Sequence, residues 1–347
     1  MSNVKSFPAS KPPEHLLRQL GLRYVSVSEL TIQRRRRGAG FVFVNGNGRA
    51  LRDPRILFRL KRLAVPPAYE NVLYAVDPHA HLQAVGRDAA GRAQYRYHPD
   101  WEKVRELRKA RRLARLAEAL PKIRTWVSRH IADREPSRER AIAAVIDLVA
   151  LTALRPGSET YAKQHGTRGA ATLLKSDLRI VGERVSLKFI GKGSKPIEKE
   201  VRSARLALAL KRLAALPGTR MFQYRNQDGA VLTLRRREVN TALREIAGRA
   251  VSLKDFRTLV ACSNALEQLA EMEPKPSQRG RKRQLLATMR EVAADLANTP
   301  AVCRRSYVHA AVVDAFESGT LKRLARGRRT TASRERLLVK VLARVSP

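Results

Sequence analysis

The chain has 347 residues, enough for two domains, and 44% of them are hydrophobic, enough for a substantial core. Lys and Arg number 70 against 31 Asp and Glu, which gives a formal net charge of +39. A folded protein this basic repels itself unless a polyanion is its usual partner, and nucleic acid is the first candidate. A ribosomal or anionic membrane surface is a weaker candidate, and the charge says nothing about catalysis.

Two cysteines, Cys262 and Cys303, form no CxxC pair and belong to no Cys/His cluster with zinc spacing. We therefore expect no disulfide framework, no metal site and a reducing cytoplasm. No Walker A pattern is present, so we expect neither ATP nor another cofactor. Residues 1–19 begin with a polar, proline-bearing stretch and are predicted to be a disordered leader without a signal peptide or membrane span.

Residues 20–98 are predicted to form a small, mainly β domain. Phe41–Val44 followed by Asn45–Gly48 is typical of a strand that enters a hairpin turn. Further short strands are expected at residues 72–76, 81–85 and 94–98, with a short basic helix at residues 54–63.

Two cationic segments of this domain are candidates for polyanion binding. The first is the run Arg34, Arg35, Arg36 and Arg37. Such a run is usually a solvated loop, but in so basic a chain it is also a candidate phosphate contact. The second places aromatic rings among polar and cationic side chains: Arg92, Gln94, Tyr95, Arg96 and Tyr97. Such interleaving suits contact with bases and backbone, but simple alternation on a half-buried strand explains it equally well.

From Pro99 onward apolar residues recur at helical spacing, so we predict a boundary there and a mainly helical domain over residues 99–326. Its expected helices cover residues 101–117, 120–131, 138–152, 203–215, 234–247, 252–272 and 284–296, and its expected strands cover residues 178–181, 185–190 and 197–201. Residues 274–283 are predicted to be a basic linker, and residues 327–347 a basic C-terminal tail with one helix. The predicted fold class is α+β.

Three cationic residues in this second domain stand at helix ends or turns, from which a side chain can enter a cleft. Arg155 precedes Pro-Gly at a helix end, Lys192 lies in a glycine-flanked turn, and Arg257 lies in the first turns of a helix that a Ser252/Asp255 capping box opens. Taken singly, each is more simply a surface residue or a salt-bridge partner. Lys254 precedes Arg257 by three residues.

The stretch Asn298–His309 is the most distinctive. Thr299 is a good N-cap and Pro300 suits the first helical position, which places Asn298 before a helix and Tyr307 about two turns into it. A tyrosine hydroxyl is a weak nucleophile, with a free pKa near 10, and needs a cationic pocket and an electrophile such as a phosphodiester. In isolation, an ordinary helical tyrosine is the better interpretation.

Taken together, five segments in chain order resemble those of type IB DNA topoisomerases, specifically the small poxvirus-like enzymes of bacteria. The segments are Gln94–His98, Leu154–Gly157, Phe189–Lys192, Lys254–Thr258 and Asn298–His309. The resemblance covers roughly residues 20 to 320. Each motif is weak alone, whereas five in the family's order in so basic a chain form a specific signal.

The resemblance implies cleavage of one strand of double-stranded DNA through a 3′-phosphotyrosyl bond to Tyr307, followed by swivelling and religation without ATP or a required metal. Arg155 and Arg257 would clamp the non-bridging oxygens, and Lys192 would protonate the departing 5′-oxygen. DNA contacts would fall to Lys254 and to the cationic segments of the first domain. We expect a monomer in the bacterial cytoplasm, associated with the nucleoid.

One departure concerns Asn298, which stands nine residues before Tyr307, where the viral and eukaryotic relatives carry histidine. An amide can replace an imidazole that donates a hydrogen bond to a phosphate oxygen, but not one that transfers a proton. We adopt the first interpretation, because the arginines carry the charge.

Two alternatives remain at this point. A tyrosine recombinase shares the Arg/Lys/Arg/Tyr set, but typically has His-x-x-Arg where this chain has Lys254-x-x-Arg257, and a helical rather than β-rich N-terminal domain. A non-catalytic DNA-compacting protein would explain the charge alone.

Overall fold

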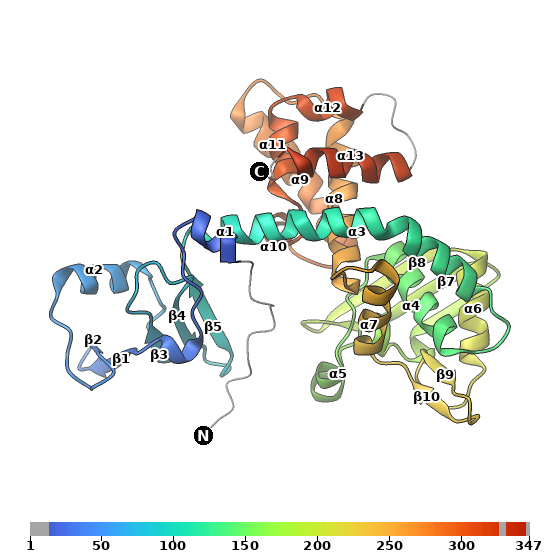
Figure 1. The fold of residues 1–347 in the computed structure, drawn as a ribbon, viewed down its shortest axis with the longest axis horizontal. Helices are drawn as coiled ribbons and strands as arrows, with labels where there is room; N and C mark the ends of the chain where they lie inside the picture. Colours follow the sequence, from blue (N-terminus) through green and yellow to red (C-terminus); the bar gives the residue numbers. More distant parts are fainter. Residues whose placement is uncertain (1–13, 326–330, 345–347) are drawn as a thin grey trace. The chain divides into compact units, whose positions relative to one another are not determined.

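A computed structural model describes residues 14–325 and 331–344, and the fold is α+β, as predicted (Figure 1). The chain divides between Arg108 and Lys109 into two compact units. The division falls inside helix α3 (Trp101–Ile131) rather than at residue 99, because the first turns of α3 pack with the N-terminal unit. Trp101 and Val104 are buried there against Leu17 and Leu22.

The N-terminal unit is built on a five-stranded antiparallel sheet in the order β2-β1-β3-β4-β5. Its strands are β1 (Ile32–Arg37), β2 (Gly40–Val44), β3 (Glu70–Tyr74), β4 (Leu82–Arg87) and β5 (Ala93–Tyr97), and its helices are α1 (Glu14–Gln19) and α2 (Pro54–Arg62). Asp53 caps α2 by accepting from Arg55 N at 2.8 Å. Leu60 on this helix is buried in a core that includes Ile32, Phe43 and Tyr74.

Two predictions for this unit were wrong. Residues 14–19 of the expected disordered leader form α1, because Leu16 and Leu17 are buried side chains; residues 1–13 lie outside the described part. The arginine run is strand β1, paired with β2, rather than a loop. Ile32 anchors that strand in the core, and the guanidinium of Arg34 donates to the carbonyls of Val65 and Tyr69.

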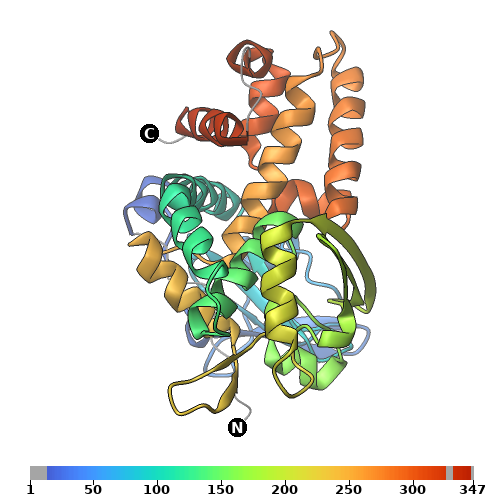
Figure 2. The same cartoon turned by 90° about the vertical axis from the view of Figure 1, so that its right-hand side faces the viewer.

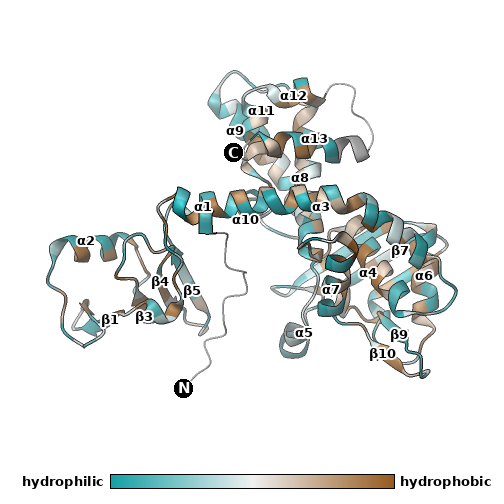
Figure 3. Ribbon diagram, in the orientation of Figure 1, coloured by the Kyte–Doolittle hydropathy of each residue, from teal (hydrophilic) through white to brown (hydrophobic). Residues whose placement is uncertain are grey.

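Helix α3 runs unbroken through Pro121, where the sequence predicted two helices. An internal proline removes one backbone hydrogen bond and costs about 3 kcal/mol. The same apolar stripe continues on both sides of it, with Leu113 and Leu116 buried before and Ile123 and Val127 buried after. Figure 3 shows hydrophilic and hydrophobic residues alternating along this helix, as burial of one face requires.

The second unit is organised around α4 (Arg138–Thr152), which contacts α6, α7, α8 and the edge of a three-stranded antiparallel sheet. The sheet has the order β6-β7-β8, and α6 packs on it (Figure 2). Its strands are β6 (Leu178–Val181), β7 (Arg184–Gly191) and β8 (Lys195–Arg202), close to the predicted ranges. A two-stranded sheet of β9 (Gln223–Arg225) and β10 (Val231–Thr233) was not predicted.

The second unit contains nine further α-helices within the described residues. They are α5 (Glu159–His165), α6 (Ala204–Ala214), α7 (Arg236–Ala247), α8 (Leu253–Ala270), α9 (Gln278–Asp295), α10 (Pro300–Ser306), α11 (Ala310–Glu317), α12 (Thr320–Ala325) and α13 (Thr331–Ala343). Among the helices of residues 14–325 and 331–344, none is long and apolar enough to cross a membrane.

Two boundaries of this unit differ from the prediction. Helix α9 begins inside the expected linker, because Ser277 caps it by accepting from Gly280 N at 3.0 Å. The expected C-terminal tail contains α13, whose Leu338 and Val341 are buried in the main core, so this helix belongs to the second unit. Residues 327–330, the start of the expected basic tail, lie outside the described residues.

Candidate active site

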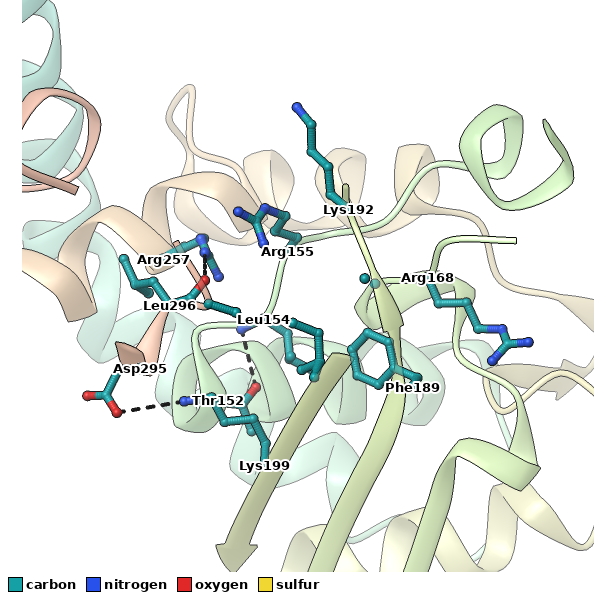
Figure 4. A pocket seen from close by; sticks show the side chains of 14 residues that line it. Thr152, Leu154, Arg155, Arg168, Phe189, Lys192, Lys199, Arg257, Asp295 and Leu296 are labelled. Atoms are coloured by element: carbon teal, nitrogen blue, oxygen red, sulfur yellow. Dashed lines mark hydrogen bonds and ion pairs between the residues drawn. The ribbon is translucent and has the colours of Figure 1, made fainter. Parts of the chain in front are cut away.

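Three of the predicted site residues, Arg155, Lys192 and Arg257, line one pocket of the second unit (Figure 4). The pocket is small, with a cavity volume of about 20 Å³, and is partly open to solvent. Its walls come from the segment after α4, the β7–β8 turn, the start of α8 and the end of α9. Arg155 and Arg257 are 102 residues apart in the chain, and the fold brings both to one place with Lys192, as the sequence order of the motifs led us to expect.

The backbone of Arg155 is held firmly while its side chain is half-exposed. Its carbonyl accepts from Ala170 N at 2.8 Å, and Pro156 O accepts from Ala171 N at 3.0 Å. A Cβ added to Gly169 would lie only 2.5 Å from Arg155 O, so no other residue allows this close approach. The turn that presents Arg155 is thus fixed by direct backbone packing.

Lys192 occupies the turn between β7 and β8, at the hairpin tip predicted for it. Gly193 and Ser194 take positive φ values of 75° and 56°, which close this short turn. Lys192 is exposed, and no hydrogen bond or ion pair joins its ammonium to another residue within the described ranges. Its side chain therefore has freedom to move toward a bound anion.

Arg257 is almost completely buried, with 3% of its surface exposed. Its Nη1 donates to Ala153 O and its Nη2 to Leu296 O. These two carbonyls belong to the C-cap residues of α4 and α9, where the helix dipole places partial negative charge. No carboxylate in the described part of the chain forms an ion pair with Arg257, so its full positive charge is not neutralised by an acid.

Burial lowers the pKa of Arg257, the neighbouring Tyr307 opposes this change, and the like charge of Arg155 adds to it. The guanidinium nevertheless stays protonated, since an arginine in a protein keeps its proton at physiological pH. Arg257 is thus a permanent cation that shares a pocket with Arg155 and contacts the ring of Tyr307.

Tyr307 follows the last residue of α10 as its C-cap, rather than lying inside the helix as predicted. Thr299 and Pro300 begin this helix as predicted, and Thr299 Oγ1 accepts from Val302 N at 3.3 Å. The guanidinium carbon of Arg257 lies 5.1 Å from the centroid of the half-buried Tyr307 ring. The tyrosine therefore stands beside the cationic cluster, although it does not line the pocket itself.

Asn298 lies in the connection between α9 and α10. It directly follows Leu296 and Ala297 in the sequence, and both of these residues line the pocket. Its backbone N–H reaches back to Ala293 O at 2.9 Å, closing the end of α9 around Ala297, which has a φ of 44°. Its Oδ1 accepts from Thr299 N at 3.1 Å. In the described residues its Nδ2 has no hydrogen-bond acceptor, so the amide retains donors for a ligand.

The remaining predicted DNA contacts divide into exposed and internally bonded groups. Lys254 is exposed on the first turn of α8, and Arg35 and Arg36 are exposed on β1. Arg92 and Gln94 both donate to Asp88 Oδ2, at 2.9 Å each.

On β5 the rings of Tyr95 and Tyr97 are 6.1 Å apart, and Tyr97 stacks on Trp101 at 5.9 Å. The structure thus provides an aromatic surface at the predicted segment, while Arg34 is bonded within the chain.

Sequence reasoning missed Lys199 and Asp295, which line the same pocket. Lys199 Nζ lies 3.9 Å from Asp295 Oδ1, on the opposite side of the pocket from Lys192 (Figure 4). Burial lowers the pKa of Lys199, Asp295 opposes the change, and Arg257 reinforces it. Alternation along β8 would have placed Lys199 on the inward face with Ile197, so a signal for it existed.

Arg168 also lines the pocket but turns away from the other cations (Figure 4). Its guanidinium donates to Asp177 Oδ1 at 2.6 Å, and its backbone N–H bonds to Ile190 O at 2.8 Å. This arginine therefore joins two segments of the pocket wall.

Comparison with known proteins agrees with this arrangement. Residues 98–331 match the family model for the catalytic core of eukaryotic DNA topoisomerase I, and residues 40–88 match the N-terminal domain of bacterial DNA topoisomerase IB. DNA topoisomerase 1B of Acanthamoeba polyphaga mimivirus is 28% identical over 284 residues, which cover 80% of this chain and 84% of that protein. The enzyme of the same name from vaccinia virus (strain Copenhagen) is 23% identical over 235 residues, covering 66% and 71%.

A solved structure of XerH, a site-specific recombinase bound to its difH substrate, overlaps with 55% of this chain and 49% of its own at 15% identity. The TM-score of 0.35 is too low for this overlap to support a recombinase. The catalytic-core match, by contrast, spans well over half of the chain. The chain therefore belongs to the type IB DNA topoisomerase family.

Proposed function

We propose that this protein relaxes supercoiled duplex DNA by cutting and rejoining one strand through a covalent bond to Tyr307. The observation that carries the proposal is the position of Arg257, which lies 5.1 Å from the Tyr307 ring and shares a pocket with Arg155 and Lys192. A phosphodiester at this pocket would meet a nucleophile and several cations together. Family membership and the net charge of +39 support DNA as the substrate.

The cleavage step begins with attack of Tyr307 Oη on phosphorus, while the tyrosine proton passes to water. The bond between phosphorus and the 5′-oxygen breaks, and Lys192 Nζ donates a proton to that oxygen. The products are a 3′-phosphotyrosyl enzyme and a free 5′-hydroxyl strand, which swivels. Religation reverses these steps and needs no ATP, because the phosphotyrosyl bond retains the energy of the phosphodiester.

Arg155 and Arg257 would stabilise the transition state by donating to the non-bridging oxygens as charge accumulates on them. Arg257 needs no further ordering, because two carbonyls already hold its guanidinium. Asn298 Nδ2 would supply a third donor. These groups neutralise the charge, so the step includes no metal ion.

Lys192 would reach the leaving oxygen by a movement of the β7–β8 turn or of its own side chain. Its exposure and its position at a hairpin tip are consistent with such a movement. Lys192 would then reach the 5′-oxygen only when DNA occupies the pocket, so it would donate its proton only to bound substrate.

We propose that the protein acts on double-stranded DNA as a monomer, because Arg155, Lys192 and Arg257 of one chain line the same pocket. We further propose that it acts at the nucleoid in the bacterial cytoplasm. The aromatic surface of β5, together with Arg35, Arg36 and Lys254, would contribute DNA contacts outside the pocket.

The direct test is to trap the covalent adduct and identify the modified peptide. Incubation with a nicked suicide duplex should yield an adduct on the peptide that contains Tyr307. Tyr307→Phe should form no adduct and relax no plasmid while binding duplex DNA with parental affinity. An adduct on another residue, or relaxation by Tyr307→Phe, would refute the proposal.

A further inference from the structure

Lys109, on the part of α3 that belongs to the second unit, reaches the segment that carries Tyr307. Its Nζ donates to Arg305 O at 3.1 Å and to Val308 O at 3.4 Å. These carbonyls stand on either side of Tyr307 in the chain. One ammonium group therefore joins the residues before and after the tyrosine.

The short helix α10 needs such support. It has seven residues, and helices of this length are not stable by themselves in water. The last carbonyls of any helix have no partner within the helix, and a lysine side chain can satisfy them and complement the helix dipole. Lys109 supplies this cap from another helix, so the geometry at the end of α10 depends on it.

A second contact fixes the same turn from α8. Cys262 Sγ donates to Tyr307 O at 2.9 Å, and the sulfur accepts from His309 N at 3.3 Å. Tyr307 N donates to Cys303 O at 2.9 Å, which completes the last turn of the helix. Carbonyls of residues 305, 307 and 308 are thus held by side chains of α3 and α8.

We propose that Lys109 is a positioning residue for Tyr307, and that its ammonium sets the direction from which the tyrosine hydroxyl meets the phosphodiester. This inference rests on the proposed function of Tyr307. The competing role is contact between Lys109 and a DNA phosphate, which would affect affinity rather than the reaction itself.

The test compares Lys109→Met, which keeps a long apolar side chain but loses the donors, with Lys109→Arg, which keeps donors. Single-turnover cleavage is measured with saturating enzyme on a suicide duplex, beside duplex affinity and its salt dependence. For Lys109→Met we expect the cleavage rate constant to fall by about tenfold or more, since misplacement of a reacting group by about 1 Å costs up to roughly 100-fold. Lys109→Arg should recover most of the rate.

Arg115→Met is the matched control, because Arg115 is an exposed cation on the same helix. It should cleave at the parental rate at saturation. Lys109→Met should slow religation as much as cleavage, since the tyrosine attacks in one direction and leaves in the other. A variant that is merely less stable would lose reaction amplitude and keep its rate constants.

Unchanged rate constants at saturation, with weaker binding and a shallower salt dependence, would show a phosphate contact and overturn the inference. Failure of Lys109→Arg to recover any rate would also overturn it. Failure of the proposed function is distinguishable, because the wild-type adduct would then map away from Tyr307 whatever the Lys109 variants do.

Discussion

Replacing Gly169 by alanine should displace Arg155 and slow cleavage, although the substitution alters none of the proposed reacting side chains. The added Cβ would lie 2.5 Å from Arg155 O, 2.5 Å from Gly157 N and 2.7 Å from Gly157 Cα. Ordinary contacts begin at 3.4 Å, so the turn would have to retreat by about 0.9 Å, the difference between 3.4 and 2.5 Å. All three atoms are backbone, so no side-chain rotation relieves the clash.

A displacement of this size at a transition-state donor should lower the cleavage rate by roughly 100-fold. Overpacking should also lower the free energy of unfolding by about 1–3 kcal/mol. The rate is measured by single-turnover cleavage of a suicide duplex, with thermal denaturation and duplex affinity measured in parallel.

Gly46→Ala serves as the control for Gly169→Ala, because the nearest atom to a Cβ at Gly46 is a side-chain carbon at 3.6 Å. The control should match the parent in rate and stability. A folded Gly169→Ala protein that cleaves at the parental rate would refute the claim that backbone packing at Gly169 sets the position of Arg155.

Three further predictions concern Arg257, Asn298 and the affinity for duplex DNA. Arg257→Lys should lower single-turnover cleavage by roughly 10²–10³, because an ammonium lacks the planar five-donor fork with which the guanidinium holds both carbonyls and faces the phosphate; a parental rate would contradict the clamp. Asn298→Ala should slow cleavage at saturation by about tenfold or more, and Asn298→His should not, since histidine restores a donor; equal rates for alanine and parent would exclude the amide as a donor. Duplex affinity, measured by fluorescence anisotropy at several salt concentrations, should fall steeply as salt rises, because bound phosphates release counterions; a flat profile would argue against a phosphate-tracking interface.

Local signals in the sequence predicted much of this fold. Thr299 and Pro300 identify the start of α10, and the Ser252/Asp255 pair identifies the start of α8, because caps act within one turn. The β7–β8 hairpin follows from alternation and from glycines beside Lys192. The same short-range rules failed at Pro121, where distant packing outweighs a local penalty.

The site itself was only partly predictable. The motifs identified Arg155, Lys192 and Arg257 as site residues, but the sequence does not reveal the hydrogen bonds that position them. Arg257 bonds to carbonyls 104 and 39 residues away, and a carbonyl is present at every position in the chain. Lys109 lies 196 residues from the carbonyl of Arg305 and shares no local pattern with it. Partners of this kind emerge only when the chain is folded.

The anchoring of Arg257 has a consequence for how this protein tolerates mutation. Its two acceptors are main-chain oxygens at Ala153 and Leu296, and no side-chain replacement at those positions removes an oxygen. The anchor therefore depends on where α4 and α9 end, and not on which residues stand there. Substitutions that preserve both helix ends, such as glycine at the left-handed Ala153, should leave the guanidinium in place. Arg257, the most buried cation of the site, is thus held by hydrogen bonds that side-chain substitutions at the acceptor positions do not remove.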